Sequence, residues 1–357
     1  MSAHFHRLRI ADIVPETAEA NSIRFDVPPE LEQAFRFRAG QHLTLRAEID
    51  GEEVRRNYSL CTAPGDGELM VTVKRIAGGK FSNWVADNLK AGDDIDVMPP
   101  LGSFTCDFDP ARARRYVGIA GGSGITPVMS LIRTALGTEP GSRFTLFYGN
   151  RDSASVIFLD ALAALKDRYM GRFELYHFLA EEEQDIDLFN GLLDKPTCAT
   201  AIRELVPDPG SVDAWFICGP GPMMDAAESA LLDSGIAKER IHIERFTAGR
   251  PSAALAQEMA ELQSKAAGTT VQVTLDGRTR RVPFSQSNIL DSARVAGLPA
   301  PFACKAGVCA TCRARVTSGK VEMAARYGLT DEEIAAGYVL TCQSVPVGDG
   351  VAVDYDA

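Results

Sequence analysis

The sequence predicts a multidomain protein with an antiparallel β-barrel, a doubly wound α/β domain and a small α+β domain. Residues 1–110 hold short runs of alternating apolar and β-branched residues between glycine turns, a pattern typical of a barrel. Residues 111–246 alternate strand and helix patterns, as a doubly wound parallel sheet does. Residues 270–357 combine strands, a helix and a cysteine-rich loop, and the Ala-, Ser- and Gln-rich residues 247–269 indicate a linker with some helix.

The composition argues against several classes of protein. With 357 residues and 45% hydrophobic content, the chain can form more than one core. Its net charge of −11 argues against nucleic acid as a main partner. The N-terminus lacks the apolar core of a signal peptide and no run reaches about 18 apolar residues, so no membrane segment is expected. Cysteines 61, 106, 198 and 218 stand singly, which suits reduced thiols and a cytoplasmic location.

Four further cysteines indicate an iron–sulfur cluster. Cys304, Cys309 and Cys312 follow a Cys-x4-Cys-x2-Cys spacing and Cys342 comes 29 residues later, which is the plant-type [2Fe–2S] pattern. Two irons and two sulfides need four thiolates, and Gly307 lets the loop fold closely around them. Disulfides would require an oxidising compartment, and zinc sites usually carry two Cys-x2-Cys pairs where this sequence has one. We therefore expect the cluster.

One strand of the predicted barrel carries Arg56, Tyr58 and Ser59. Because alternate residues of a strand share a face, these side chains offer a phosphate contact, an aromatic ring and a hydroxyl to a ligand. The alternative is that Tyr58 fills the core and Arg56 is solvated.

A glycine turn that contains Gly79 follows, and Ser82 is predicted to cap a helix over residues 83–89. A glycine turn before a helix N-terminus suits a pyrophosphate. An ordinary capped helix after a turn is the alternative.

A second phosphate-binding unit is predicted after the strand at residues 115–120. The strand runs into a glycine loop that contains Gly122 and Gly124, with Thr126 as the expected cap of the next helix and Pro127 at its first position. The loop departs from the strict G-x-G-x-x-G pattern, which makes the motif less specific.

Two residues bear on the choice and placement of a nicotinamide nucleotide. Arg151 stands where an NAD-binding fold carries an acidic residue, and an arginine there favours the 2′-phosphate of NADPH. A solvated surface arginine is an equally good interpretation. Cys218 ends a strand directly before Gly219. A thiol at this place can line a nicotinamide pocket, and the alternative is a buried structural cysteine.

Taken together, these motifs resemble the ferredoxin–NADP reductase superfamily fused to a plant-type ferredoxin, in family order and over essentially the whole chain. The resemblance implies a flavin-binding barrel at 1–110, an NAD(P)-binding domain at 111–246 and a β-grasp ferredoxin domain at 270–357. The implied cofactors are FAD, NADPH and a [2Fe–2S] cluster. The implied site residues are Arg56, Tyr58, Ser59, Gly79 and Ser82 for the flavin, Gly122, Gly124 and Thr126 for the nucleotide pyrophosphate, and Cys218, Glu244 and Phe246 near the reacting rings.

More narrowly, five segments resemble the reductase subunits of phenylacetyl-CoA epoxidases, which are multicomponent di-iron monooxygenases. They are YGNR at 148–151, CGPGPMMDAAESAL at 218–231, IHIERF at 241–246, ACKAGVCATC at 303–312 and AGYVLTCQ at 336–343. The implied electron path runs from NADPH through FAD and the cluster to di-iron oxygenase subunits. Similar reductases serve ketosteroid hydroxylases and ring-hydroxylating dioxygenases, and the phthalate type carries FMN. A stand-alone diaphorase and a non-enzymatic iron–sulfur sensor remain alternatives.

The charges of residues 270–357 suggest how the cluster domain meets its partner. Nine basic and nine acidic residues balance there, which suits a domain tethered by the 23 residues 247–269 that needs little electrostatic steering. Lys305, Arg313 and Arg315 are expected to form a basic rim that meets an acidic patch on the oxygenase. The alternative is a solvated strand face.

Overall fold

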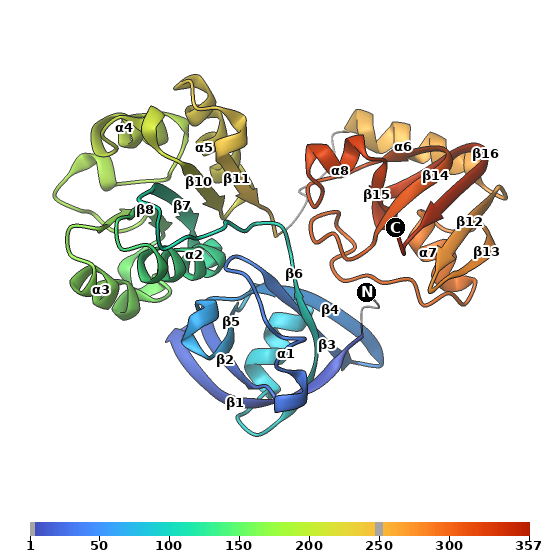
Figure 1. The fold of residues 1–357 in the computed structure, drawn as a ribbon, viewed down its shortest axis with the longest axis horizontal. Coiled ribbons are helices and arrows are strands. Elements are labelled where there is room, and N and C mark those ends of the chain that lie inside the picture. The colour runs from blue at the N-terminus through green and yellow to red at the C-terminus, as the bar shows by residue number, and fades with distance from the viewer. Residues whose placement is uncertain (1–3, 247–252) are drawn as a thin grey trace. The chain divides into compact units, whose positions relative to one another are not determined.

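A computed structural model describes residues 4–246 and 253–357 (Figure 1). No helix among these residues is long and apolar enough to cross a membrane. The chain folds as two compact units. The larger comprises His6–Val54 and Tyr58–Glu244, and the smaller is built mainly from residues after Arg245 and also takes in Arg55–Asn57.

The first part of the larger unit is a six-stranded antiparallel sheet in the order β4-β3-β6-β1-β2-β5. An isolated bridge between Leu60 and Val71 links the end after β4 to β5, as expected for a barrel. The helix α1 packs Phe81 and Val85 into the barrel core. The strands are β1 (His6–Thr17), β2 (Ala20–Asp26), β3 (His42–Ile49), β4 (Glu52–Ser59), β5 (Leu69–Lys74) and β6 (Asp94–Leu101), and α1 spans Lys80–Asn88.

The second part of the larger unit is a five-stranded parallel sheet in the order β11-β10-β7-β8-β9. Helices α2 and α3 cover one face and α4 and α5 the other (Figure 1), which is the doubly wound arrangement that the sequence predicts. The elements are β7 (Arg115–Gly121), α2 (Ile125–Thr138), β8 (Arg143–Asn150), α3 (Leu159–Arg168), β9 (Phe173–Leu179), α4 (Lys195–Leu205), β10 (Ala214–Cys218), α5 (Gly221–Asp233) and β11 (Ile241–Glu244).

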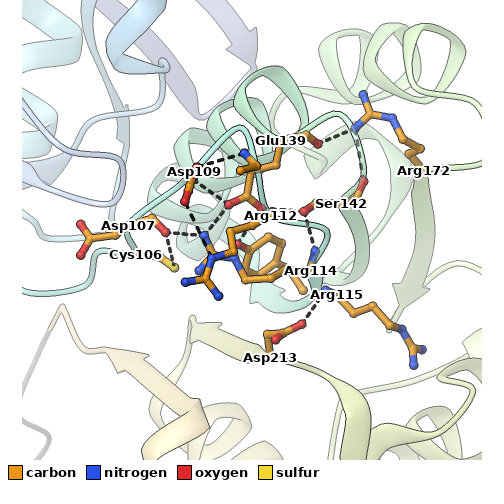
Figure 2. A network of polar contacts seen from close by, with 12 residues as sticks. Cys106, Asp107, Asp109, Arg112, Arg114, Arg115, Glu139, Ser142, Arg172 and Asp213 are labelled. Atoms are coloured by element: carbon orange, nitrogen blue, oxygen red, sulfur yellow. Dashed lines mark hydrogen bonds and ion pairs between the residues drawn. The ribbon is translucent and has the colours of Figure 1, made fainter.

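The two parts of the larger unit are joined through a buried carboxylate, Glu139, at the end of α2 (Figure 2). It accepts hydrogen bonds from the Asp109 N–H (2.9 Å), the Tyr116 hydroxyl (2.9 Å) and the Ser142 hydroxyl (2.6 Å), and it pairs with Arg114. Burial acts to raise the pKa of Glu139, but the hydrogen bonds, with that from Ser142 first, outweigh it and hold the pKa below its ordinary value. The segment that leaves the barrel is thereby fixed to the parallel sheet.

The smaller unit is a mixed five-stranded sheet in the order β13-β12-β16-β14-β15, in which only β12 and β16 are parallel. Its helices pack on this sheet around one apolar core, which gives the expected α+β domain. The elements are α6 (Ala253–Ala266), β12 (Thr270–Leu275), β13 (Arg278–Pro283), α7 (Ile289–Val295), β14 (Arg313–Met323), α8 (Asp331–Ala335), β15 (Tyr338–Leu340) and β16 (Ser344–Asp354).

The helix α6 (Ala253–Ala266) lies within residues 247–269, where the sequence indicated a linker. It buries Met259 and Ala266 in the core of the smaller unit, with Leu255 and Leu262 partly buried beside them. Its 14 residues therefore pack with this domain, in the stretch where the sequence indicated a linker with some helix, and the boundaries of the linker stay a prediction. Residues 247–252 of the expected linker lie outside the described residues.

Candidate functional site: a nucleotide crevice and a cysteine loop

The glycine loop after β7 lies against the carboxyl end of β10. A Cβ atom at Gly124 would overlap the carbonyl oxygen of Cys218, and one at Gly121 would lie 2.6 Å from the sulfur of Met223. Gly124 has no room for a side chain because the atom it would meet belongs to the backbone, whereas a side chain at Gly121 would require the Met223 and Pro220 side chains to shift. The strand order reverses between β7 and β10, which is where ligands bind in open α/β sheets.

Side chains of Tyr148 and Thr126 hold the backbone of this glycine loop. Gly122 has a positive φ of 51°, and its carbonyl accepts a hydrogen bond from the buried Tyr148 hydroxyl at 3.0 Å. The prediction that Thr126 caps the helix is wrong, because α2 begins at Ile125 with Gly124 as its N-cap. Thr126 is buried, and its hydroxyl donates to the Ser123 carbonyl at 3.0 Å, so it holds the loop from the first turn of α2.

Cys218 and Glu244 end adjacent strands and are in register with each other. The Cys218 side chain is fully buried, and burial, assisted by the negative charge of Glu244, raises its pKa well above the ordinary value. The thiol is therefore neutral and is no nucleophile. Glu244 Oε1 lies 3.9 Å from Nδ1 of His42, which comes from β3 of the barrel. Phe246 falls in the other compact unit and is 39% exposed, so its role stays a prediction.

The predicted flavin residues lie on β4. Tyr58 is partly buried, with its ring centre 5.9 Å from that of Phe81, whereas Ser59 is buried and Arg56 is exposed. Strand alternation puts Arg56 and Tyr58 on one face of β4 and Ser59 on the other, and the binding of a flavin by the three residues stays a prediction.

The turn before α1 is built differently from the prediction. α1 begins at Lys80 with Gly79 as its N-cap, and Ser82 lies inside the first turn. The Ser82 hydroxyl is buried and accepts a hydrogen bond from the Ile76 N–H at 3.2 Å, and a Cβ atom at Gly79 would lie only 2.7 Å from it. Ser82 therefore braces the turn, and the first N–H groups of α1 remain available to an anion.

Arg151 follows β8, and its side chain is 53% exposed. Its guanidinium lies 3.5 Å from the carboxylate of Glu19, and the same carboxylate lies 3.8 Å from Nζ of Lys74. Lys74 Nζ would in turn lie 3.9 Å from a Cβ atom at Gly122. Sequence reasoning missed Glu19, because a turn of the barrel meets the end of β8 only in the folded chain.

Hydrogen bonds link the four predicted ligand cysteines in two pairs. The Cys304 N–H donates to the Cys309 sulfur at 3.5 Å, and the hydroxyl of Thr341, which precedes Cys342, donates to the Cys312 carbonyl at 2.9 Å. The Ala306 N–H donates to the Cys304 sulfur at 3.2 Å. Thiols with an N–H donor to a sulfur fit a [2Fe–2S] cluster, and the assignment of these four as its ligands stays a prediction.

Gly307 is required for a reason that the sequence did not show. Its φ is positive (73°), and a Cβ atom there would lie 2.8 Å from Cγ of Gln343 and 3.0 Å from Ala325. A side chain at this position is therefore excluded by neighbouring protein atoms, in addition to the close folding around the cluster that the sequence predicted.

The expected basic rim is engaged within its own domain. Lys305 pairs with Asp291 at 2.6 Å, Arg313 pairs with Glu333, and the Arg315 guanidinium donates to the Ala336 carbonyl at 3.2 Å. These contacts favour the alternative of an ordinary strand face.

Three family models match the chain in sequence. The "Oxidoreductase FAD-binding domain" matches residues 7–106, the "Oxidoreductase NAD-binding domain" 119–229 and the "2Fe-2S iron-sulfur cluster binding domain" 273–347. These matches cover the barrel, the parallel sheet and the mixed sheet.

Relatives match the chain over its whole length. One component of the 1,2-phenylacetyl-CoA epoxidase from Escherichia coli (strain K12) is 44% identical, covering 99% of this chain and 98% of the relative. The ferredoxin reductase component of 3-ketosteroid-9-alpha-monooxygenase from Mycobacterium tuberculosis (strain CDC 1551 / Oshkosh) is 39% identical, covering 99% and 96%. The solved structure of phthalate dioxygenase reductase shares the fold, with a TM-score of 0.59, 24% identity and 98% of each chain covered. The chain therefore belongs to the family of oxygenase reductases and is an NAD(P)H-dependent flavin iron–sulfur oxidoreductase that uses FAD and a [2Fe–2S] cluster.

Proposed function

We propose that this reductase delivers electrons to the di-iron oxygenase subunits of a phenylacetyl-CoA epoxidase. The observation that carries the proposal is the 44% identity to the E. coli epoxidase component over 99% of this chain. The 39% identity to the ketosteroid monooxygenase component supports a second candidate, an oxygenase of that type. A cytoplasmic location belongs to the proposal, and the eight free cysteines of the structure are in keeping with it.

The nucleotide crevice supports a role in placing NAD(P)H. Bound FAD supplies the conversion between a hydride donor and a one-electron acceptor, and the protein supplies orientation and charge. In the proposal, the N–H groups of the loop at Gly122 and Gly124 bind the pyrophosphate of the nucleotide, with Thr126 fixing the loop from inside. Arg151 selects the 2′-phosphate of NADPH. Cys218, a neutral and fully buried thiol, lies near the nicotinamide ring in this proposal and neither donates nor accepts a proton.

The barrel holds FAD in the same proposal. Arg56, Tyr58 and Ser59 bind the flavin from β4, and the first turn of α1 behind Gly79 binds its pyrophosphate, with Ser82 as the brace. The ring-side residues are Glu244, with His42 beside it, and Phe246.

Cys304, Cys309, Cys312 and Cys342 are the proposed ligands of the cluster. For the domain boundaries we propose 1–110 for the flavin domain and 111–246 for the nucleotide domain. Because α6 packs in the core of the smaller unit, we place the start of the ferredoxin domain at Ala253, earlier than the composition suggested.

The test is reconstitution with purified oxygenase subunits. We expect epoxide to form from phenylacetyl-CoA in proportion to the NADPH consumed, and only when this protein is present. The oxygenase component of a ketosteroid monooxygenase serves as the comparison. Fast reduction of quinones or ferric ions without coupled epoxide formation would instead identify a diaphorase, and a preparation without bound flavin would support the sensor alternative.

A further inference from the structure

Gln343 directly follows Cys342, which lies in the short turn between β15 and β16. Its side-chain nitrogen donates a hydrogen bond to the Lys305 carbonyl at 2.9 Å, across 38 positions of sequence. The same nitrogen lies 3.1 Å from the Cys342 carbonyl and 3.7 Å from the Cys342 sulfur, which is within hydrogen-bond range for sulfur. The amide of Gln343 therefore contacts both Lys305, in the loop from Cys304 to Cys312, and Cys342.

The stem of Gln343 makes a second contact with the same loop. Its Cγ lies so close to Gly307 that a Cβ atom there would be only 2.8 Å away. Lys305, whose carbonyl accepts the amide, has a positive φ of 52°, a conformation that costs energy for a residue with a side chain. Gln343 thus holds a strained part of the loop by its amide and by its stem.

The direction of the amide is settled by its partners. Both the Lys305 and Cys342 carbonyl oxygens are acceptors, so they require the nitrogen and its hydrogens to face them. The amide has two N–H groups, so one donates to Lys305 and the other is shared between the Cys342 carbonyl at 3.1 Å and the Cys342 sulfur at 3.7 Å. An N–H donor to a ligand sulfur stabilises the added negative charge of a reduced cluster and so raises its reduction potential.

We propose that Gln343 is a positioning residue for the [2Fe–2S] cluster, which sets the loop against Cys342 and raises the potential at which the cluster accepts an electron. The inference rests on the proposed ligation by Cys342. It adds a residue outside the four-cysteine pattern to the electron path.

The test compares cluster potentials in full-length protein. Gln343→Met keeps the length and apolar stem but removes the donor, and Gln343→Glu keeps the shape but puts a carboxylate against two carbonyls. Gln272→Met, at an exposed position on β12 of the same domain, is the matched control. The readouts are a redox titration followed by electron paramagnetic resonance, the g values of the reduced cluster, and the rate of cluster loss to a chelator.

We expect Gln343→Met to lower the ratio of reduced to oxidised cluster about two- to twelvefold at the midpoint potential of the unmodified protein, the size expected of one neutral hydrogen bond. Gln343→Glu should lower the ratio further, both variants should shift the g values and lose the cluster faster, and Gln272→Met should match the unmodified protein. Resonance reports only loaded molecules, so partial loss of cluster leaves the readout intact.

Two results would overturn different statements. An unchanged potential and unchanged g values in Gln343→Met, together with an altered cluster in Cys342→Ser, would overturn the role of Gln343 alone. An unaltered cluster in Cys342→Ser would overturn the ligand assignment and the inference with it.

Discussion

The choice between NADPH and NADH can be tested at Arg151 and its neighbour Glu19. Arg151→Ala removes the guanidinium that we propose for the 2′-phosphate, and Glu19→Gln removes the carboxylate that holds that guanidinium in the free protein at 3.5 Å. The two changes should act in opposite directions. Arg151→Ala should weaken the preference for NADPH, and Glu19→Gln should strengthen it.

The magnitude follows from the exposure of the pair. A charge-assisted hydrogen bond to the phosphate is worth about 1.5–3 kcal/mol. The side chains of Arg151 and Glu19 are 53% and 44% exposed, and an ion pair this exposed is worth only about 0.2–1 kcal/mol. This energy is lost when Arg151 leaves Glu19 to bind the 2′-phosphate of NADPH. The difference is about 0.5–2.8 kcal/mol, so Arg151→Ala should reduce the NADPH preference by roughly 2- to 100-fold. Glu19→Gln should increase it by about 1.4- to 5-fold.

The assay is kcat/KM for NADPH and for NADH with ferricyanide as acceptor, in the unmodified protein, both single variants and the double variant. Arg203→Ala is the matched control, because Arg203 is an exposed arginine of the same domain paired with Glu204. The effect of Glu19→Gln on the ratio of the two nucleotides should vanish once Arg151 is gone, because the other contact of Glu19, with Lys74, lies beside the Gly122 loop that we propose for the pyrophosphate common to both nucleotides. Equal kcat/KM for the two nucleotides in the unmodified protein, or an unchanged ratio in Arg151→Ala, would refute the reasoning.

Three more outcomes are expected. Cys304→Ala should abolish the visible absorbance of the cluster and electron delivery to the oxygenase while NADPH still reduces the flavin; an intact cluster spectrum would contradict the ligand assignment. Glu139→Gln should lower the free energy of unfolding by about 1–3 kcal/mol at pH 7. Because the pKa of Glu139 is lowered on folding, its contribution to stability is complete above the ordinary carboxyl pKa and is lost as pH falls through the pKa of the folded state. The free energies of unfolding of the two proteins should therefore converge in acid. An equal difference between these free energies at pH 7 and pH 3, measured by denaturant unfolding, would contradict this. Gly124→Ala should abolish binding of NADPH because its methyl group would overlap the Cys218 carbonyl, and an unchanged dissociation constant would show that the crevice is looser than described.

The sequence predicted best where the chemistry is local. The spacing of four cysteines predicted an iron–sulfur domain without any knowledge of the fold, and the family model for a 2Fe-2S domain confirms that domain. The hydroxyls of Ser82 and Thr126 were misjudged as helix caps, because both glycine loops end in a glycine N-cap and the hydroxyl lies within the first turn. A hydroxyl near a glycine turn can cap a helix or brace the turn, and only the backbone geometry decides which.

The packing of α6 and the presence of α4 could have been predicted from local sequence patterns, whereas two contacts between distant segments could be seen only in the folded chain. The role of α6 was open to prediction, since Leu255, Met259, Leu262 and Ala266 recur at helical spacing and form the buried face. The helix α4 was missed although Asp194, which caps it through the Thr197 N–H, is followed by a proline within the first turn. The contacts of Glu19 with Arg151 and of Gln343 with Lys305 join segments distant in sequence, so no local pattern indicates them.

The contact between Gly124 and the Cys218 carbonyl also bears on how such a reductase can change in evolution. Where main chain touches main chain, as at Gly124, a side chain cannot be added without displacing the backbone of Cys218, so this position offers almost no neutral substitutions. Arg151 and Glu19 have about half of their side-chain surface in solvent, so their charges can be exchanged without repacking a core. Under the proposed role of Arg151, a lineage changes its nucleotide preference at these exposed charges while Gly124 stays glycine.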